Sequence, residues 1–133
     1  MSVQAENLDI VRGLYAAFAE RRIDAILAVL SPEVEWGEPD NPHNPTAGMH
    51  RGHEGFLEWA DIGRRSEEIT ALEPRKMLVD EDSVAVVGFQ RCLAVATGKV
   101  YESDFVHLVT LHDGKVTKFQ EFFDTYAAAE AFR

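Results

Sequence analysis

The chain has 133 residues, of which 46% are hydrophobic and 27% charged, with a formal net charge of -10. This length predicts a single domain, residues 1–133, built around one hydrophobic core. The acidic excess excludes nucleic acid and anionic membrane surfaces as expected partners, because no basic patch is left to neutralise phosphates.

The N-terminus predicts no exported or membrane-inserted protein. It lacks the basic and apolar regions of a signal peptide, and no apolar run approaches membrane-spanning length. The one cysteine, Cys92, cannot form an internal disulfide, and we expect it to be a small buried apolar residue. The expected location is therefore the reducing cytoplasm.

The first half of the chain predicts helices. Apolar residues repeat at helical spacing from Leu8 to Phe18, and a second short helix is expected from Asp24 to Leu30, where Ser31-Pro32 stops it. A short strand, Val34-Glu35-Trp36, precedes a loop from residue 39 to 48 with three prolines, whose length predicts a lid or pocket rim. A third helix opens at Gly52 and carries Phe56, Trp59 and Ile62.

The second half predicts strands. They are expected at Ile69 to Val79, Val84 to Ala96, Tyr101 to Leu111 and Val116 to Phe123, and Pro74 marks an edge or bulge in the earliest of them. A final short helix from Tyr126 to Phe132 is capped by Asp124 or Thr125. Helices followed by a mostly antiparallel meander predict an α+β domain, a cone in which a curved sheet wraps around the N-terminal helices and leaves a pocket at its open end.

The last two strands are joined by Asp113-Gly114, the strongest short-range hairpin signal. Because successive strand side chains point to opposite faces, His107 shares a face with Phe105 and Val109, and Glu121 shares one with Phe119 and Phe123. A titratable group among apolar neighbours is costly unless it is paired or solvated. His107 and Glu121 therefore either satisfy each other or line a pocket that uses them.

Three segments resemble a known family. These are residues 11–18, residues 30–36 and the hairpin from His107 to Asp124. Together they resemble the SnoaL-like group of the nuclear-transport-factor-2-like (NTF2-like) superfamily, which includes polyketide cyclases and is related to ketosteroid isomerases. The resemblance covers nearly the whole chain and implies the cone-shaped fold, whereas function varies widely on this fold.

The isomerases imply one set of site residues. Their aspartate base, which precedes a proline, corresponds to Glu38, and the protonated aspartate of their oxyanion hole corresponds to His107. Their tyrosine position falls at Leu14, one residue and about 100° of helix rotation from Tyr15. This departure argues against steroid isomerase activity itself.

The cyclases imply a second, overlapping set. In them a histidine and an acid lie fourteen residues apart on the last two long strands, a spacing that His107 and Glu121 share. Glutamate replaces the usual aspartate here. An imidazole held by a carboxylate is a workable acid–base pair for deprotonating a carbon next to a carbonyl.

Two main hypotheses follow. In the first, the protein is a cofactor-free isomerase or cyclase of a small hydrophobic carbonyl compound, with His107, Glu121 and Glu38 as catalytic residues. In the second, the same pocket binds a hydrophobic ligand without turnover. In both, the expected ligand-binding residues are aromatic: Tyr15, Phe18, Trp36, Trp59, Phe105, Phe119 and Phe123. A weaker alternative is epoxide hydrolysis, because relatives of that type use two aspartates bridged by an arginine, and Arg91 and Asp104 could supply part of that set.

No metal or cofactor is expected. His43, His50 and His53, with Glu54, match none of the compact zinc spacings. Asp124 is expected to be a helix cap rather than a base.

A homodimer is expected. It would form through the outer face of the sheet, where Val106 and Leu108 lie opposite His107 and form an uncovered apolar patch. The resemblance implies the same, because relatives commonly pair by these faces.

Overall fold

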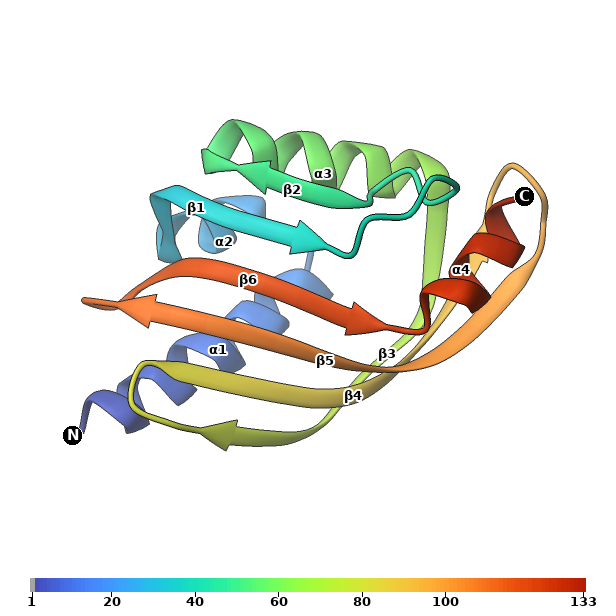
Figure 1. Cartoon of the computed structure of the whole chain (residues 1–133). Coiled ribbons are helices and arrows are strands. Elements are labelled where there is room, and N and C mark those ends of the chain that lie inside the picture. The colour runs from blue at the N-terminus through green and yellow to red at the C-terminus, as the bar shows by residue number, and fades with distance from the viewer. Residues whose placement is uncertain (1) are drawn as a thin grey trace.

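The computed structural model describes residues 2–133 as four helices and one six-stranded sheet (Figure 1). The helices are α1 (Val3–Ala19), α2 (Ile23–Val29), α3 (Gly52–Ser66) and α4 (Thr125–Phe132). The strands are β1 (Leu30–Glu38), β2 (Gly48–Arg51), β3 (Glu67–Val79), β4 (Ser83–Ala94), β5 (Val100–His112) and β6 (Lys115–Phe123). None of these helices is long and apolar enough to cross a bilayer.

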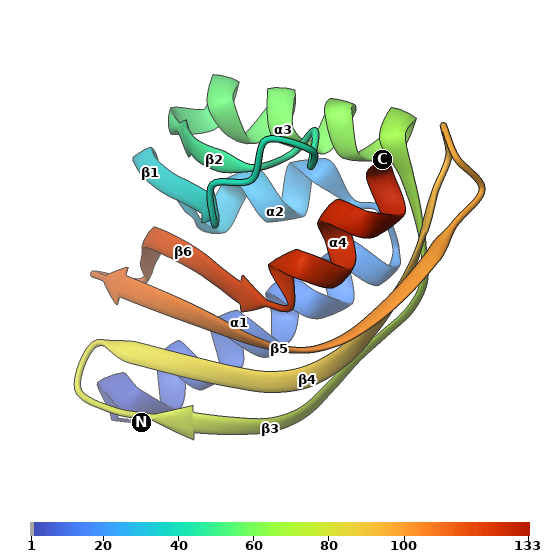
Figure 2. The same ribbon diagram turned by 45° about the vertical axis from the view of Figure 1, so that its right-hand side comes forward.

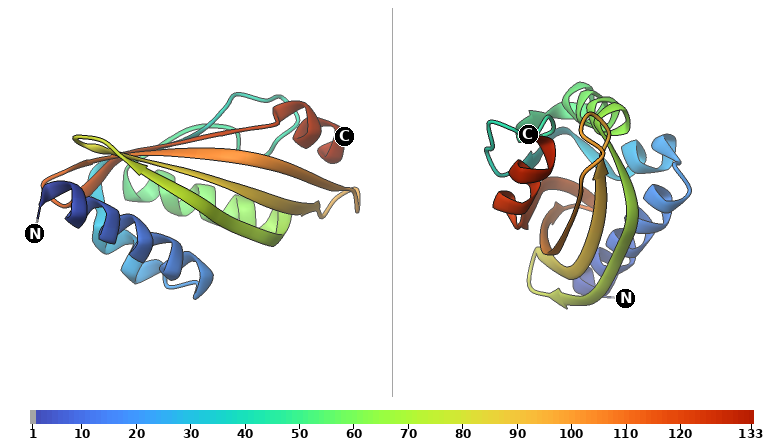
Figure 3. Two further views of the ribbon diagram at one scale, coloured as in Figure 1. Left: turned by 90° about the horizontal axis from the view of Figure 1, so that it is seen from below. Right: turned by 90° about the vertical axis from the view of Figure 1, so that its right-hand side faces the viewer.

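The sheet has the strand order β2-β1-β6-β5-β4-β3, and every pair is antiparallel except β1 with β6. It curves strongly, as Figure 2 shows, and α1, α2 and α3 lie on the same side of it (Figure 3). This is the α+β, NTF2-like architecture that the sequence predicts.

The core lies between α1 and the inner face of the sheet. Val11 and Leu14 of α1 are buried in one apolar cluster with Val84, Val109 and Leu111. A smaller cluster joins α4 to the far ends of β4 and β5, and its buried members are Cys92, Ala94, Tyr101, Ala128 and Ala131. Between the two clusters the inner face carries the polar side chains of the site.

The hairpin prediction is confirmed in detail. Asp113 and Gly114 have φ angles of 47° and 76°, and two positive φ angles at the central residues are typical of a type I′ turn. The turn pairs Leu111 with Val116, and a register shift between Thr110 and Leu111 then places His107 directly opposite Glu121.

Other local predictions are also confirmed. Pro74 lies in the edge strand β3 at a register irregularity, where a missing N–H is tolerated. Asp124 caps α4 by accepting a hydrogen bond from the backbone N–H of Ala127 at 3.0 Å. Cys92 is buried.

Three element bounds differ from the prediction. Leu30 does not end a helix but begins β1, opposite Val116, and Pro32 is accommodated where the register of that pair shifts. Strand β2 was not expected; Gly48 and Gly52 flank it with φ angles of 93° and 70°, which other residues rarely adopt. Strand β4 stops at Ala94 because a turn closes there, with the Gly98 N–H donating to the Ala94 carbonyl.

Candidate functional site

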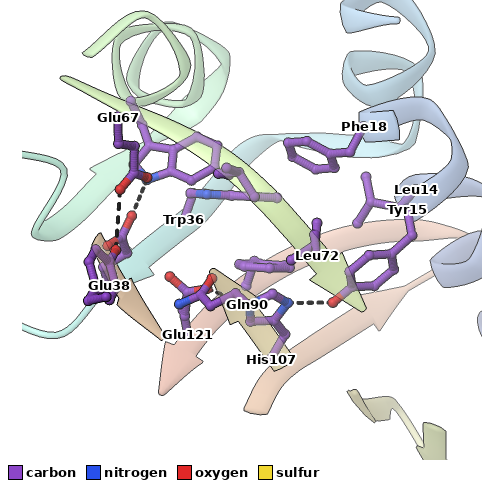
Figure 4. Close-up of a pocket in the computed structure, with 14 residues that line it drawn as sticks. Leu14, Tyr15, Phe18, Trp36, Glu38, Glu67, Leu72, Gln90, His107 and Glu121 are labelled. Carbon is purple, nitrogen blue, oxygen red and sulfur yellow. Dashed lines mark hydrogen bonds and ion pairs between the residues drawn. The ribbon is translucent and has the colours of Figure 1, made fainter. Parts of the chain in front are cut away.

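A cavity lies between α1, α3 and the inner face of the sheet, and it is lined by 14 residues (Figure 4). Its volume of about 70 Å³ exceeds the roughly 10–15 Å³ that one water molecule requires. Ile69 and Leu72 of the edge strand β3 line it and are exposed, so they form its rim. The lining residues are Leu14, Tyr15, Phe18, Trp36, Glu38, Trp59, Glu67, Ile69, Leu72, Gln90, Tyr101, His107, Phe119 and Glu121.

Three polar side chains form a connected chain at the wall of this cavity. His107 Nε2 lies 2.5 Å from Glu121 Oε2, and the Tyr15 hydroxyl is hydrogen-bonded to His107 Nδ1. The side chains of His107 and Glu121 are only 5% and 13% exposed. A neutral ring protonated on Nε2 donates to Glu121 and accepts from Tyr15, so this arrangement satisfies all three groups.

Tyr15 reaches this chain from α1. Burial and the nearby charge of Glu121 raise the pKa of Tyr15, so its hydroxyl stays protonated over the physiological range. Leu14 also lines the cavity. The one-residue offset that argues against steroid isomerase activity therefore does not remove Tyr15 from the site.

The His107 ring is held between aromatic side chains. It stacks on Phe105 at a centroid distance of 4.0 Å and lies 4.9 Å from Phe119. Phe105 is buried behind the histidine and does not line the cavity, and neither does Phe123, which packs against both apolar clusters. The expectation that these two phenylalanines line the pocket is thus wrong: Phe105 lies under the His107 ring, and the partly buried Phe123 packs between the two apolar clusters.

The other aromatic residues lie where the sequence places them. Trp36 stacks on Phe119 at 3.9 Å across the parallel β1–β6 pair, and Trp59 lies 5.2 Å from Trp36. Phe18 packs near both tryptophans. Together with Tyr15, these four line the cavity.

Glu38 is a second buried carboxyl at the cavity. Trp59 Nε1 donates to its Oε2 at 2.6 Å and Asn44 Nδ2 donates to its Oε1 at 3.1 Å. Burial, followed by the charge of Glu121, raises the pKa of Glu38 to about 8, although the hydrogen bond from Trp59 opposes the rise. Its carboxyl therefore keeps its proton at neutral pH.

A third carboxyl, Glu67, was not predicted. It begins β3, and the Tyr101 hydroxyl donates to its Oε2 at 3.2 Å. Burial, followed by the charge of Glu121, raises the pKa of Glu67 to about 7. Nothing in the sequence marks this position, because it lies at a helix–strand junction with no defined parity.

Gln90 and Tyr101 were also missed, although a signal was present. Both occupy inward positions of their strands, and Gln90 interrupts the alternating buried series that contains Val86 and Cys92. A polar residue at an inward strand position is costly unless it is used or paired. Strand parity alone could have found both.

Several sequence candidates lie outside the cavity. Arg91 pairs with Glu102 on the outer surface, at 2.8 Å between Arg91 Nε and Glu102 Oε1, and Asp104 is exposed. Neither residue that suggested epoxide hydrolysis therefore lies in the cavity, because strand parity places both on the outer face of the sheet.

Two of the three histidines proposed as metal ligands contact backbone carbonyls instead. His50 Nε2 lies 3.0 Å from the Thr46 carbonyl and His53 Nε2 lies 3.0 Å from the Leu30 carbonyl, whereas His43 is exposed. Within residues 2–133, no three histidine, cysteine or acidic side chains are grouped closely enough to hold a metal ion.

Known proteins resemble the chain over most of its length. Residues 11–119 match the model of the SnoaL-like domain family. An uncharacterised protein of Mycobacterium tuberculosis is 28% identical over 127 residues, which are 95% of each chain. An NTF2-like protein from Burkholderia xenovorans LB400 is 32% identical, with a TM-score of 0.90 over 98% of each chain. TerC, co-crystallised with polyporic acid, is 30% identical, with a TM-score of 0.83 over 96% of this chain and 98% of TerC.

Proposed function

The chain belongs to the SnoaL-like domain family, and we propose that it isomerises or cyclises a compact, mostly apolar carbonyl compound by acid–base chemistry that needs no cofactor. The observation that carries this proposal is the chain of hydrogen bonds from Tyr15 through His107 to Glu121 at the wall of an aromatic cavity. Titratable groups in a cleft are typical of sites that move protons.

Glu121 is the base in this scheme. It removes a proton from the carbon next to the carbonyl, and the electron pair of that C–H bond moves onto the carbonyl oxygen as an enolate. Returning the proton to another carbon completes an isomerisation, and attack by the enolate carbon on a second carbonyl completes a cyclisation. Glu38, which keeps its proton at neutral pH, is placed to return a proton.

His107 links the base to the donor. In the neutral ring, Nε2–H donates to Glu121 and Nδ1 accepts from the Tyr15 O–H. When the enolate forms, its oxygen is a stronger acceptor than Nδ1, so the Tyr15 O–H turns from Nδ1 to the enolate oxygen and no additional proton is needed. Stabilising developing charge by a preorganised donor is often the largest single contribution to catalysis.

A relative has been crystallised together with a small organic molecule. TerC was co-crystallised with polyporic acid, and its likeness to this chain spans nearly all of both. The aromatic side chains that line the cavity suit an apolar ligand oriented by few polar contacts.

The proposal is tested by exchange of α-protons for deuterium in a panel of cyclic enones and aryl ketones, followed by NMR in D₂O. Exchange reports deprotonation even when the natural product is unknown. We expect catalysed exchange with the intact protein and its loss in Glu121→Gln. Glu102→Gln is the matched control, because that glutamate lies on the outer surface.

The second candidate is a ligand-binding protein without turnover. The observation in its favour is that Tyr15, His107 and Glu121 satisfy each other without a substrate. Compounds that bind but never exchange their α-protons would support this candidate and contradict the enzyme.

We also propose a homodimer through the outer face of the sheet. Val106 and Leu108 are half-buried there, and Phe122, paired with Val106, is 49% exposed. Contiguous apolar surface of this kind marks interfaces. Sedimentation that shows only a 14.9 kDa species at micromolar concentration would contradict the dimer.

A further inference from the structure

The cavity has two chemically different sides (Figure 4). Leu14, Tyr15 and Phe18 lie on one side, whereas Glu38 and Glu67 lie on the other, with Glu121 nearer to them than to Phe18. The three carboxyls interact electrostatically, because the charge of Glu121 helps to raise the pKa of both Glu38 and Glu67. A ligand in this cavity therefore meets an acidic side as well as an apolar one.

No cation balances these carboxyls from the lining. Among the residues of the described chain that line the cavity, there is no lysine and no arginine. His107 is the one nitrogen base in the lining, and it is already hydrogen-bonded to Tyr15 and Glu121. An anionic ligand would meet no opposite charge from lysine or arginine in this lining, and the net charge of -10 repels it before it arrives.

Gln90 is an independent sign that the cavity takes a polar group. Its side chain lines the cavity from β4 and the residue is only 5% exposed, yet its amide makes no hydrogen bond to another lining residue (Figure 4). A buried amide is rarely left without a partner. Its amide can accept a hydrogen bond from an ammonium group through its oxygen, while its NH2 group and the unpartnered Trp36 Nε1 can donate to a ligand carbonyl.

The aromatic walls suit the same kind of group. Trp36, Trp59, Phe18 and Phe119 line the space that the carboxyls face, and tryptophan rings attract ammonium groups most strongly. Aromatic rings combined with carboxylates are how proteins recognise organic cations.

We propose that the ligand of this cavity is a compact aromatic carbonyl compound that also carries a protonated amine, and that the ammonium group lies against Glu67, Glu38 and Glu121. This substrate class deepens the proposed function, since it concerns the same cavity, but the binding preference does not depend on turnover. The amine occupies the acidic side while the carbonyl lies toward Tyr15.

Binding of such an amine releases protons. Glu38, with a pKa of about 8, holds its proton at neutral pH, and Glu67, with a pKa of about 7, is partly protonated, because burial and neighbouring charge disfavour their ionised forms. An ammonium group supplies a positive charge that stabilises the ionised carboxylates, so the carboxyls release their protons when it binds. Affinity for the amine should therefore increase as pH rises toward about 8, whereas affinity for a neutral analogue should not.

The test uses three acetophenones that differ only at the para position, which carries an aminomethyl, a hydroxymethyl or a carboxymethyl group. Isothermal titration near neutral pH in two buffers with different ionisation enthalpies gives both affinity and protons released. We expect the amine to bind at least tenfold more tightly than the alcohol, the carboxylate to bind more weakly than both, and only the amine to release protons. Equal binding of amine and alcohol, or preference for the carboxylate, would overturn the proposal.

Two variants locate the effect. Glu67→Gln should reduce the preference for the amine over the alcohol by about tenfold and leave the alcohol's affinity unchanged, and thermal melting checks that the variant is folded. Glu68→Gln, at the exposed neighbouring position of β3, is the matched control and should keep the full preference. An unchanged preference in Glu67→Gln would contradict the placement of the amine.

The same three compounds separate this proposal from the proposed function. Preferential binding of the amine without α-proton exchange would support the ligand class and contradict the enzyme. Exchange of the α-protons of the alcohol, without preferential binding of the amine, would support the enzyme and contradict the ligand class.

Discussion

The two halves of the β5–β6 hairpin lie on either side of a register shift and differ in chemistry. Near the turn, the inward residues are Val109, Leu111 and Val116, each buried among apolar side chains. Farther from the turn, the inward residues include His107 and Glu121, which line the cavity. A register shift between Thr110 and Leu111 separates the halves, and it turns Phe119 and Glu121 of β6 inward where strict alternation from Val116 would place Lys118 and Gln120.

What differs is the layer that covers each half. The turn half packs against Val11 and Leu14 of α1 in one apolar cluster. The cavity half joins the same cluster through Phe105 and Phe119, but His107 and Glu121 line the cavity, and these two polar groups are hydrogen-bonded to each other. The comparison teaches that the turn half provides stability and that the cavity half is free to provide chemistry.

The sharpest test of the turn half is Leu111→Ala. Removing this 3% exposed side chain leaves a space that the packed neighbours cannot fill, so we expect a loss of about 2–5 kcal/mol in the free energy of unfolding. Urea denaturation measures it. Ligand affinity of the folded fraction should stay the same, and a loss well below this range would show that the turn half is not the rigid part.

The corresponding change in the cavity half is His107→Ala, with Glu121→Gln beside it. If the pair is catalytic, each variant slows turnover by about 10²-fold or more, which is about 2.7 kcal/mol of barrier, and leaves folding intact. If it is a structural ion pair, stranding one partner costs about 3–5 kcal/mol of stability instead. Kinetics and melting curves on both variants distinguish these outcomes, and no change in either would remove the site assignment.

The pH dependence of stability should come from the cavity half. Glu38 has a pKa of about 8 in the folded protein against an ordinary value of 4.5, so between these values the folded state holds a proton that the unfolded state has lost. Stability therefore falls as pH rises, by up to about 1.4 kcal/mol for each pH unit, and the contribution is lost above about pH 8. Unfolding measured from about pH 5 to about pH 8 should show this fall, and Glu38→Gln should flatten it. A slope unchanged in that variant would assign the fall to other groups.

The smallest expected effect is that of Tyr15→Phe. It removes one hydroxyl from the chain while keeping the ring that stacks near His107. We expect affinity for an aryl ketone to fall by about tenfold and stability to change by about 1 kcal/mol, near the value of one hydrogen bond. Tryptophan fluorescence titration measures the affinity. A loss of stability larger than that of Leu111→Ala would reverse the comparison between the two halves.

The sequence predicts the fold more completely than the site. The type I′ turn at Asp113-Gly114 follows from local rules, but by itself it would pair His107 with Gln120. The register shift between Thr110 and Leu111 brings Glu121 opposite His107, and no residue pattern predicts that shift. Glu67 could not be predicted, because its position depends on how α3 meets β3. Phe105 has the predicted parity but lies behind His107, since parity gives the face of a residue and not what covers it.

The parallel pairing of β1 with β6 has a consequence for how the chain folds. Trp36 and Phe119 are neighbours in that pair, yet more than half of the chain lies between them. The antiparallel strands from β3 to β6 connect through local turns, whereas joining β1 to β6 requires closure of a long loop whose entropy is lost before the contact is gained. We therefore expect the stacked rings of Trp36 and Phe119 to come together late, so that the cavity is completed after the hairpin that carries His107 and Glu121 has formed.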